Sequence, residues 1–360
     1  MSRGAGFAAI STKTRVVLAV SALGVLISGG LVAGAARPVV IFVLSALTLA
    51  ALAALVGDAT EQLGSRMGAG ATGILQSALG NLPELLISIF ALRAGLVTVV
   101  QAALVGSILG NSLLVLGIAF LLGGLRHGTQ RFDREIPNLI ALMTLVAVSA
   151  VSLPTAARLL HAPAASHEQA LSIAAALVLL VLFAGSLVYA LRGGQPQGPG
   201  GEAEAARRWP LWFALVVLGG AGVASAFASD WFVTALKPAT QAIGISQGFT
   251  GLVIVAIAGN AVENVVGVRF ALQNRSDLAL SVILNSSLQV ALALIPALVL
   301  LSLVVASAPL TLVLSPLLVL ALGLTAVITA VIVFDGESTW IEGLALIALY
   351  ALIATSFWWG

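Results

Sequence analysis

The stretch Gly80-Asn81-Leu82-Pro83-Glu84-Leu85-Leu86 places a carboxylate in the middle of an otherwise apolar segment. A second version, Gly259-Asn260-Ala261-Val262-Glu263-Asn264-Val265, follows 179 residues later, so Asn81 matches Asn260 and Glu84 matches Glu263. The same offset relates Ser107 to Ser286. The match covers two consecutive apolar segments and therefore indicates a duplicated sequence. Ionisable residues inside a membrane segment are costly, and we interpret them as candidates for a functional site.

The composition predicts a polytopic membrane protein. Hydrophobic residues make up 60% of the chain and charged residues only 8%, whereas a soluble domain carries about 25% charge. Cysteine is absent, which excludes disulfides, thiolate metal sites and a cysteine nucleophile. The basic residues are scattered among loops, so we expect the lipid bilayer and not a nucleic acid as the macromolecular environment.

The apolar runs predict an all-α membrane protein with about eleven transmembrane helices, since a span needs about 20 residues. The spans are expected near 16–35, 38–57, 69–92, 98–122, 136–155, 170–191, 210–229, 248–272, 278–304, 309–334 and 340–358. The predicted organisation is an N-terminal segment with the first helix (1–37), a first repeat (38–192), a flexible cytoplasmic linker (193–208) and a second repeat (209–360). Ala33-Gly34-Ala35 resembles a signal-peptide cleavage site, but the apolar run is too long for a signal peptide, which favours a retained helix.

The distribution of basic residues predicts the orientation. With a cytoplasmic N-terminus, twelve arginine and lysine residues fall on the cytoplasmic side and four on the outside, as the positive-inside rule requires. The C-terminus of eleven spans is then outside. Glu84 and Glu263 fall on the third and eighth spans, so the two repeats enter the membrane from opposite sides. Inverted repeats of this kind are typical of transporters that work by alternating access around a midplane site.

Glycine and proline predict a helix break beside each carboxylate. Pro83 removes one helix hydrogen bond, and Gly80 adds backbone freedom next to it. Gly259 holds the corresponding place in the second repeat. Irregular backbone at membrane depth is tolerated where it lines a cavity, although proline and glycine are also common as plain kinks in membrane helices.

Glu84 and Glu263 could bind a hard cation, because carboxylate, amide and carbonyl oxygens are the ligands of calcium. Asn81 and Asn260 precede the carboxylates by three residues and share their helical faces. Polar residues on the spans that follow could complete the shell: Gln101, Ser107, Asn111, Asn285, Ser286, Ser287 and Gln289. The alternative for each of them is a hydrogen bond between helices.

The charge of the site suggests antiport. Two ionised carboxylates at the midplane are expensive, and one divalent cation or protons would neutralise them. A carrier that reorients only when neutralised must exchange the cation for protons. All three histidines fall in loops, so protons and metal would compete for the same carboxylates. No zinc motif or nucleophile elbow is present in the sequence, so we expect neither an enzyme nor a resident cofactor.

The two motifs resemble those of the calcium/proton exchanger family, within the cation/calcium exchanger superfamily. The resemblance extends through Gly106-Ser107-Ile108-Leu109-Gly110-Asn111 in the first half, Ser286-Ser287-Leu288-Gln289 in the second, and Asp335-Gly336-Glu337-Ser338 before the last helix. The sequence departs from the family at Asn264, where many members have histidine.

The resemblance implies two inverted five-helix repeats plus one extra N-terminal helix, in a plasma membrane, such as the inner membrane of a bacterium. It implies export of Ca2+ driven by entry of H+. By position, the ion site would be lined by Asn81, Glu84, Asn260 and Glu263, with Ser286 and Gln289 as partners in the second repeat. A sodium- or potassium-coupled exchanger and an uncoupled cation channel remain the alternatives.

Overall fold

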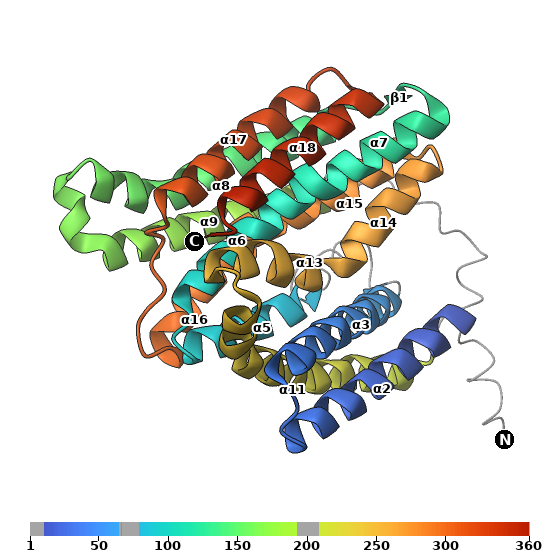
Figure 1. Cartoon of the computed structure of the whole chain (residues 1–360). Coiled ribbons are helices and arrows are strands. Elements are labelled where there is room, and N and C mark those ends of the chain that lie inside the picture. Colours follow the sequence, from blue (N-terminus) through green and yellow to red (C-terminus); the bar gives the residue numbers. More distant parts are fainter. Residues whose placement is uncertain (1–10, 65, 67–78, 193–208, 360) are drawn as a thin grey trace. The chain divides into compact units, whose positions relative to one another are not determined.

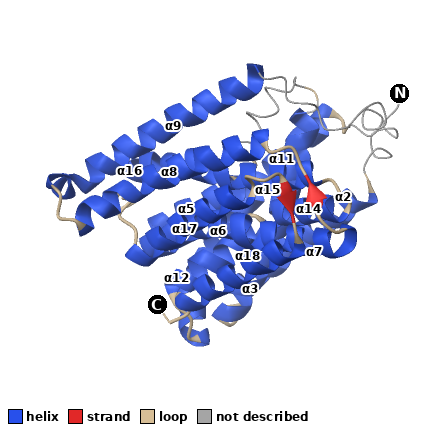
Figure 2. Cartoon of the chain, turned by 90° about the horizontal axis from the view of Figure 1, so that it is seen from above, coloured by secondary structure: helices blue, strands red, loops and turns tan. Residues whose placement is uncertain are grey.

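A computed structural model of the chain describes residues 11–64, 66, 79–192 and 209–359. The predicted linker 193–208 and the first part of the predicted span 69–92 lie outside the described residues. Helices make up almost all of the described chain, and two short strands, drawn in red in Figure 2, are the exception.

The helices follow one another along the chain with short connections (Figure 1). The α-helices are α2 (Thr12–Ala33), α3 (Pro38–Gly64), α5 (Leu82–Arg93), α6 (Val97–Leu109), α7 (Leu116–His127), α8 (Glu135–Leu159), α9 (Glu168–Arg192), α11 (Leu211–Ile243), α12 (Gln247–Phe249), α13 (Ala256–Gly259), α14 (Ala261–Leu272), α15 (Ser276–Gln289), α16 (Ile295–Val305), α17 (Pro316–Ile332) and α18 (Trp340–Ser356). The 3-10 helix is η2 (Pro163–His167), the π-helical segments are η1 (Gly110–Val115), η3 (Thr250–Val255) and η4 (Val290–Leu294), and the strands are β1 (Gln130–Arg131) and β2 (Glu337–Ser338).

Many of these helices can cross a bilayer. Within the described residues, seven are long and apolar enough, and an eighth span results if the bent pair Gln247–Gly259 and Asn264–Leu272 is one span. α17 and α18 are apolar helices of 17 residues each. Exposed Trp340 and Trp358 lie at the two ends of α18, as is typical of aromatic residues at the two membrane interfaces.

The chain forms two compact units, which are described separately: Met1–Phe90 with Ala184–Ala242, and Ala91–Phe183 with Ile243–Gly360. In the first unit α2 lies along α3. Polar contacts between the two helices include a hydrogen bond of 3.2 Å between the Ser28 and Thr48 hydroxyls and an ion pair of 3.7 Å between Lys13 and Asp58.

α3 and α11 of the first unit are joined near both ends. Phe42 stacks on Phe232 with ring centroids 4.8 Å apart. At the other end of α3, Gln62 accepts a 2.9 Å hydrogen bond from the Trp209 backbone N–H, and Arg66 donates to the carbonyl of the same tryptophan. Because Phe232 and Trp209 lie at opposite ends of α11 and its lead-in, the two helices run antiparallel.

Glycines allow close helix crossings in the second unit. α7 packs against α18 and α14, and α7 and α18 run side by side in Figure 1. Gly117 of α7 and Gly343 of α18 face one another so closely that a methyl group on either would press on the backbone of the other helix. Gly106 of α6 lies in the same way against the backbone of Leu252 in η3. These crossings bring the helices of the site close together.

One end of the second unit is tied together by loop contacts. β1 pairs with β2 in antiparallel fashion. The Gln130 amide nitrogen donates to the Ala271 carbonyl at 3.1 Å, and the Asp133 backbone N–H donates to Asp277 Oδ1 at 2.8 Å. These bonds gather at one end three loops that the sequence predicts to be cytoplasmic: the one after α7, the one between α14 and α15, and the one before α18.

The predicted start of the tenth span at residue 309 is wrong. α17 begins at Pro316, with the Ser315 hydroxyl capping its first turn, and residues 306–315 are non-helical. Proline at the first helical position is favoured because its ring fixes φ and because it lacks an N–H that would otherwise be unsatisfied. Hydropathy alone extended the span because the segment before Pro316 is itself apolar.

Candidate functional site

Four of the predicted site residues meet in the core of the second unit. Asn260 is the N-cap residue of α14, Ser107 lies on α6, Asn111 on η1 and Ser286 on α15. None of the four is more than 5% exposed. Asn111 and Ser107 come from the first predicted repeat and the other two from the second, so both halves of the sequence contribute to one polar cluster.

Hydrogen bonds join the four side chains. The amide nitrogen of Asn260 donates to Ser107 Oγ and to the Ala256 carbonyl, both at 3.0 Å. The amide nitrogen of Asn111 donates to Ser286 Oγ at 2.9 Å and to Asn260 Oδ1 at 3.4 Å. Ser286 Oγ donates to the same oxygen at 3.4 Å. Buried amides and hydroxyls need such partners, because an unpaired one costs about 1–3 kcal/mol.

The second half of the chain changes direction at this cluster. α13 ends at Gly259, Asn260 forms a turn, and α14 begins at Ala261, with a bend of 65° between the two helical parts. A helix end leaves carbonyls without intrahelical partners, and a helix start leaves free N–H groups. Glu263 is the third residue of α14, where the positive end of the helix dipole favours a carboxylate. Its side chain lies outside the described part of the structure.

The corresponding residues of the first half lie in the first unit. Gly80 and Asn81 form a turn, and α5 begins at Leu82. Pro83 and Glu84 occupy the first turn of α5, and Glu84 is completely buried. Asn81 is 7% exposed and its carbonyl accepts from the Leu85 backbone N–H at 2.9 Å. Both halves therefore place a glycine-asparagine turn directly before a helix whose first turn carries the glutamate.

Three other polar candidates differ in their surroundings. Gln289 is the half-buried last residue of α15, three positions after Ser286. Asn285 donates to the Ser281 carbonyl of its own helix at 2.8 Å. Gln101 binds a segment of chain remote from the cluster: its amide nitrogen donates to the carbonyls of Thr311 and Val313, at 3.0 and 3.1 Å. These two bonds join Gln101 to the segment 306–315.

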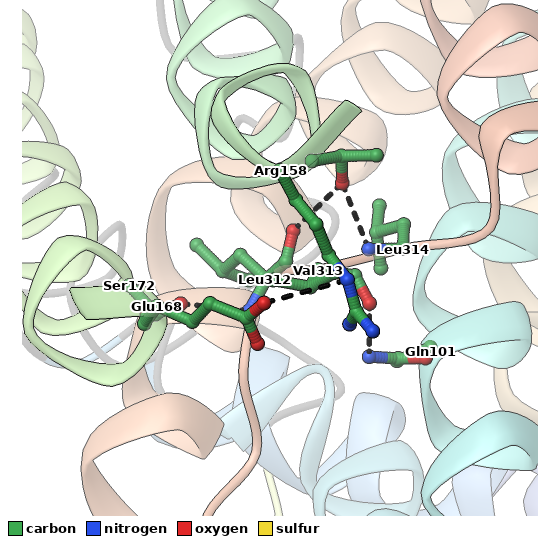
Figure 3. Close-up of polar contacts among 8 residues, drawn as sticks. Gln101, Arg158, Glu168, Ser172, Leu312, Val313 and Leu314 are labelled. Atoms are coloured by element: carbon green, nitrogen blue, oxygen red, sulfur yellow. Dashed lines mark hydrogen bonds and ion pairs between the residues drawn. The ribbon is translucent and has the colours of Figure 1, made fainter. Parts of the chain in front are cut away.

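Gln101, Thr155 and Ser172 hydrogen-bond to the backbone of the non-helical segment 306–315 (Figure 3). We call these three side chains the brace. Thr155 of α8 donates to the Leu312 carbonyl at 3.1 Å and accepts from the Leu314 N–H at 2.8 Å. Ser172 of α9 accepts from the Leu312 N–H at 2.9 Å. The side chains of Leu312 and Leu314 are buried. Side chains from three helices thus replace the strand partners that an extended backbone needs in an apolar environment.

The structure adds one polar pair that the sequence did not single out. Ser112 Oγ and Ser287 Oγ lie 2.9 Å apart, and both residues are at most 2% exposed. Ser287 was a candidate, but Ser112 was not. The signal was available, because Ser112 directly follows Asn111 in an otherwise apolar run.

The cluster consists of neutral amide and hydroxyl groups. Amide and hydroxyl oxygens bind hard cations and offer nothing to soft metals. Among the described residues no group of three or more His, Cys, Asp or Glu side chains is arranged to hold a metal. The role of the cluster in binding an ion stays a prediction.

A family model described as "Sodium/calcium exchanger protein" matches residues 37–192 and 213–359. The chain belongs to the sodium/calcium exchanger protein family. The two matched segments contain both Gly-Asn turns, the polar cluster and the Ser112–Ser287 pair. With its apolar helices, the chain is a multi-pass membrane protein.

Curated relatives in the family match most of the chain. A protein of Aphanothece halophytica named "Ca(2+)/H(+) antiporter" is 34% identical over 88% of this chain and 89% of its own length. A protein of Bacillus subtilis named "Ca(2+)/H(+) antiporter ChaA" is 33% identical, with 88% of this chain and 92% of the relative covered.

Solved structures resemble the fold along nearly the whole chain. The Ca2+/H+ antiporter protein YfkE has a TM-score of 0.81 at 30% identity, with 96% of this chain and 99% of the other covered. The H+/Ca2+ exchanger CAX has a TM-score of 0.75 at 18% identity, with 96% and 92% covered. The second likeness shows a shared fold.

Proposed function

We propose that the protein is a calcium/proton antiporter that exports Ca2+ from the cytoplasm in exchange for H+ by alternating access. Glu84 and Glu263 bind the cation or protons alternately, with Asn81 and Asn260 beside them and with Ser107, Asn111, Ser286 and Gln289 on the neighbouring helices. The observation that carries the proposal is the 34% identity, over 88% of the chain, to a protein named Ca(2+)/H(+) antiporter.

The chemistry of the described residues supports this function. Glu84 is fully buried, and an uncompensated charge at membrane depth is expensive. Ca2+ or protons neutralise such carboxylates, and the amide and hydroxyl oxygens around Asn260 are suitable ligands for Ca2+ and poor ones for soft metals. The protein then works without a resident cofactor and is not an enzyme, because the ions themselves are the substrates.

The proposed topology has eleven spans: one extra N-terminal helix and two inverted repeats of five. The positions of the helices support the repeats, because Val97 and Ser276, which start α6 and α15, are 179 positions apart. The family model also matches in two segments, 37–192 and 213–359. The N-terminus is cytoplasmic and the C-terminus outside, as the distribution of arginine and lysine favours. The membrane is the plasma membrane of a bacterium, a placement supported by the bacterial relative of Bacillus subtilis.

Everted membrane vesicles loaded with a pH-sensitive dye test the function. After the vesicles are energised, added Ca2+ should release protons from the wild-type vesicles and not from those with Glu84→Gln or Glu263→Gln. Glu135→Gln is the matched control, since Glu135 is exposed at the start of α8, and it should respond like wild type.

Other results would change the assignment. A response to Na+ or K+ but not to Ca2+ would point to a monovalent cation exchanger. Ca2+ uptake that depends on Na+ and moves no protons would make the protein a sodium-coupled exchanger. Ca2+ flux without any counter-movement would indicate a channel.

A further inference from the structure

The Ser112–Ser287 pair lies beside the polar cluster and is not used by it. The two hydroxyl oxygens are 2.9 Å apart. Asn111 and Ser286, the residues directly before them, form their own hydrogen bond of 2.9 Å. Two consecutive residues of η1 thus pair with two consecutive residues of α15, and all four are buried.

Both helices leave α-geometry at this crossing. η1 begins at Gly110, one residue before Asn111, and η4 begins at Val290, directly after Gln289. The helices that follow, α7 and α16, begin at Leu116 and Ile295, which are 179 positions apart. Each half of the sequence therefore places a π-helical segment directly before the corresponding α-helix.

The two π-helical segments are also packed reciprocally. η1 packs against α15, and η4 packs against α6. The π-helical segment of each half thus packs against the helix of the other half that carries a serine of the polar cluster, Ser286 on α15 or Ser107 on α6. π-helical turns are rare and occur frequently at functional sites, so their repetition at one crossing indicates a geometric requirement there.

The requirement is visible in the two hydrogen bonds. In an α-helix, successive side chains diverge by about 100°, so two neighbours can both reach one partner helix only over a narrow range of rotation about the helix axis. At the start of η1, Asn111 and Ser112 both reach α15. The rotation of η1 about its axis therefore decides whether the bonds to Ser286 and Ser287 can both form.

We propose that Ser112 and Ser287 are positioning residues for ion binding. Their hydrogen bond fixes the rotation of η1 against the end of α15 and thereby aims Asn111 and Ser286 at the transported cation. The two serines act through these neighbours, because each hydroxyl is already bound to the other. The proposal deepens the proposed function and rests on it for the identity of the ion.

Serine-to-alanine variants in proteoliposomes test the pair. Ser112→Ala and Ser287→Ala should each raise the KM for Ca2+ about fivefold, with kcat within twofold of wild type, as for a lost hydrogen bond of ordinary strength. The double variant should be no worse than either single one, because both remove the same bond. Ser112→Thr, which keeps the hydroxyl, should restore the KM to within twofold of wild type. Ser149→Ala, whose hydroxyl binds the Leu145 carbonyl on α8, is the matched control.

Deletion of Leu114 tests the π-helical turn itself. Leu114 is a half-buried residue of η1, and removing one residue lets the segment close as an α-helix while α6 and α7 keep their packing. The KM for Ca2+ should rise at least tenfold, while the melting temperature without Ca2+ stays within a few degrees of wild type. Should this variant fail to fold, the serine variants decide the question alone.

A structural role for the serines would give a different pattern. The melting temperature without Ca2+ would then fall, and the KM for Ca2+ would stay at the wild-type value. That result would overturn the proposal. An unchanged KM for Ca2+ in all variants would overturn it as well. A second measurement, the rise in melting temperature when Ca2+ or Na+ is added, reports cation binding independently of transport. This rise in melting temperature should be smaller in the serine variants than in the wild type, even if the wild type moves no protons. A wild type that moves no protons would reject only the proposed function.

Discussion

Asn111 donates a hydrogen bond of 2.9 Å from its amide nitrogen to Ser286 Oγ, and this bond joins a helix of the first half of the sequence to one of the second. The same amide nitrogen reaches Asn260 Oδ1 at 3.4 Å. Asn111 therefore contacts both the α15 hydroxyl and the turn that precedes Glu263, in addition to the direct Ser286–Asn260 bond. Any ion that uses Asn260 or Ser286 depends on how Asn111 holds them.

Replacing Asn111 by leucine should weaken Ca2+ binding. Asn111→Leu keeps the size of the side chain but removes the amide that donates to Ser286 Oγ and one of the two donors to Asn260 Oδ1. This loss costs about 1–3 kcal/mol and should raise the KM for Ca2+ about tenfold. Asn285→Leu is the matched control, because the Asn285 amide binds only its own helix in the contacts described. Both variants are measured by Ca2+-driven proton release in proteoliposomes. Equal KM values for the two variants would contradict this role of Asn111.

The crossing of α6 and η3 should tolerate no side chain at Gly106. A methyl group there overlaps the backbone of Leu252, and overpacking of this kind costs about 1–3 kcal/mol. Gly106→Ala should therefore lower the melting temperature in detergent by several degrees. Gly323→Ala on α17 has open space around the added methyl group and should leave the melting temperature unchanged or slightly raised. Equal melting temperatures for the two variants would show that α6 and η3 can separate.

Much of this architecture can be predicted from the sequence. Long apolar runs predict helices, because a chain that crosses a bilayer must satisfy its backbone hydrogen bonds internally. The helices α2, α3, α8 and α15 begin within four residues of the predicted starts of their spans. The offset of 179 residues singles out Ser107, Asn260 and Ser286, and Asn111 is a candidate as a polar residue on the same apolar segment as Ser107. The structure gathers these four in one cluster.

The rest depends on tertiary contacts that a hydropathy window does not register. Leu310, Leu312 and Leu314 look like part of a span, yet they alternate along an extended segment held by side chains of other helices. The π-helical turn that begins at Gly110 and packs against α15 was not predicted from the sequence either. The partners of Gln101, two backbone carbonyls about 210 residues away, could not be identified from the sequence, because a backbone carbonyl has no residue type of its own.

The brace around residues 306–315 should contribute to stability and not to ion binding. Thr155→Val removes the donor to the Leu312 carbonyl and the acceptor for the Leu314 N–H, and two unpaired buried groups should lower the melting temperature by about 5 °C. Thr144→Val is the matched control, since the Thr144 hydroxyl binds the Ile140 carbonyl of its own helix. The KM for Ca2+ should stay at the wild-type value in both. A raised KM with an unchanged melting temperature would place the brace in the transport machinery instead.

The orientation of the second unit can be tested with single cysteines, because the chain contains none of its own. Thr129 and Gln273 are exposed at the end that carries β1 and β2, whereas Ala164 and Ser307 are exposed in loops that the predicted topology places outside. In intact cells, Ala164→Cys and Ser307→Cys should react with a membrane-impermeant thiol reagent, and Thr129→Cys and Gln273→Cys should react only after the membrane is opened.

The physical reason for this expectation is the excess of arginine on the β1–β2 side, where Arg126, Arg131, Arg134 and Arg275 lie. Positive residues near the ends of spans favour the cytoplasmic side. The wild-type chain, which has no thiol, gives the background of the labelling. Labelling of Thr129→Cys and Gln273→Cys in intact cells, with Ala164→Cys and Ser307→Cys protected, would reverse the topology. The proposed direction of transport would then have to be measured again.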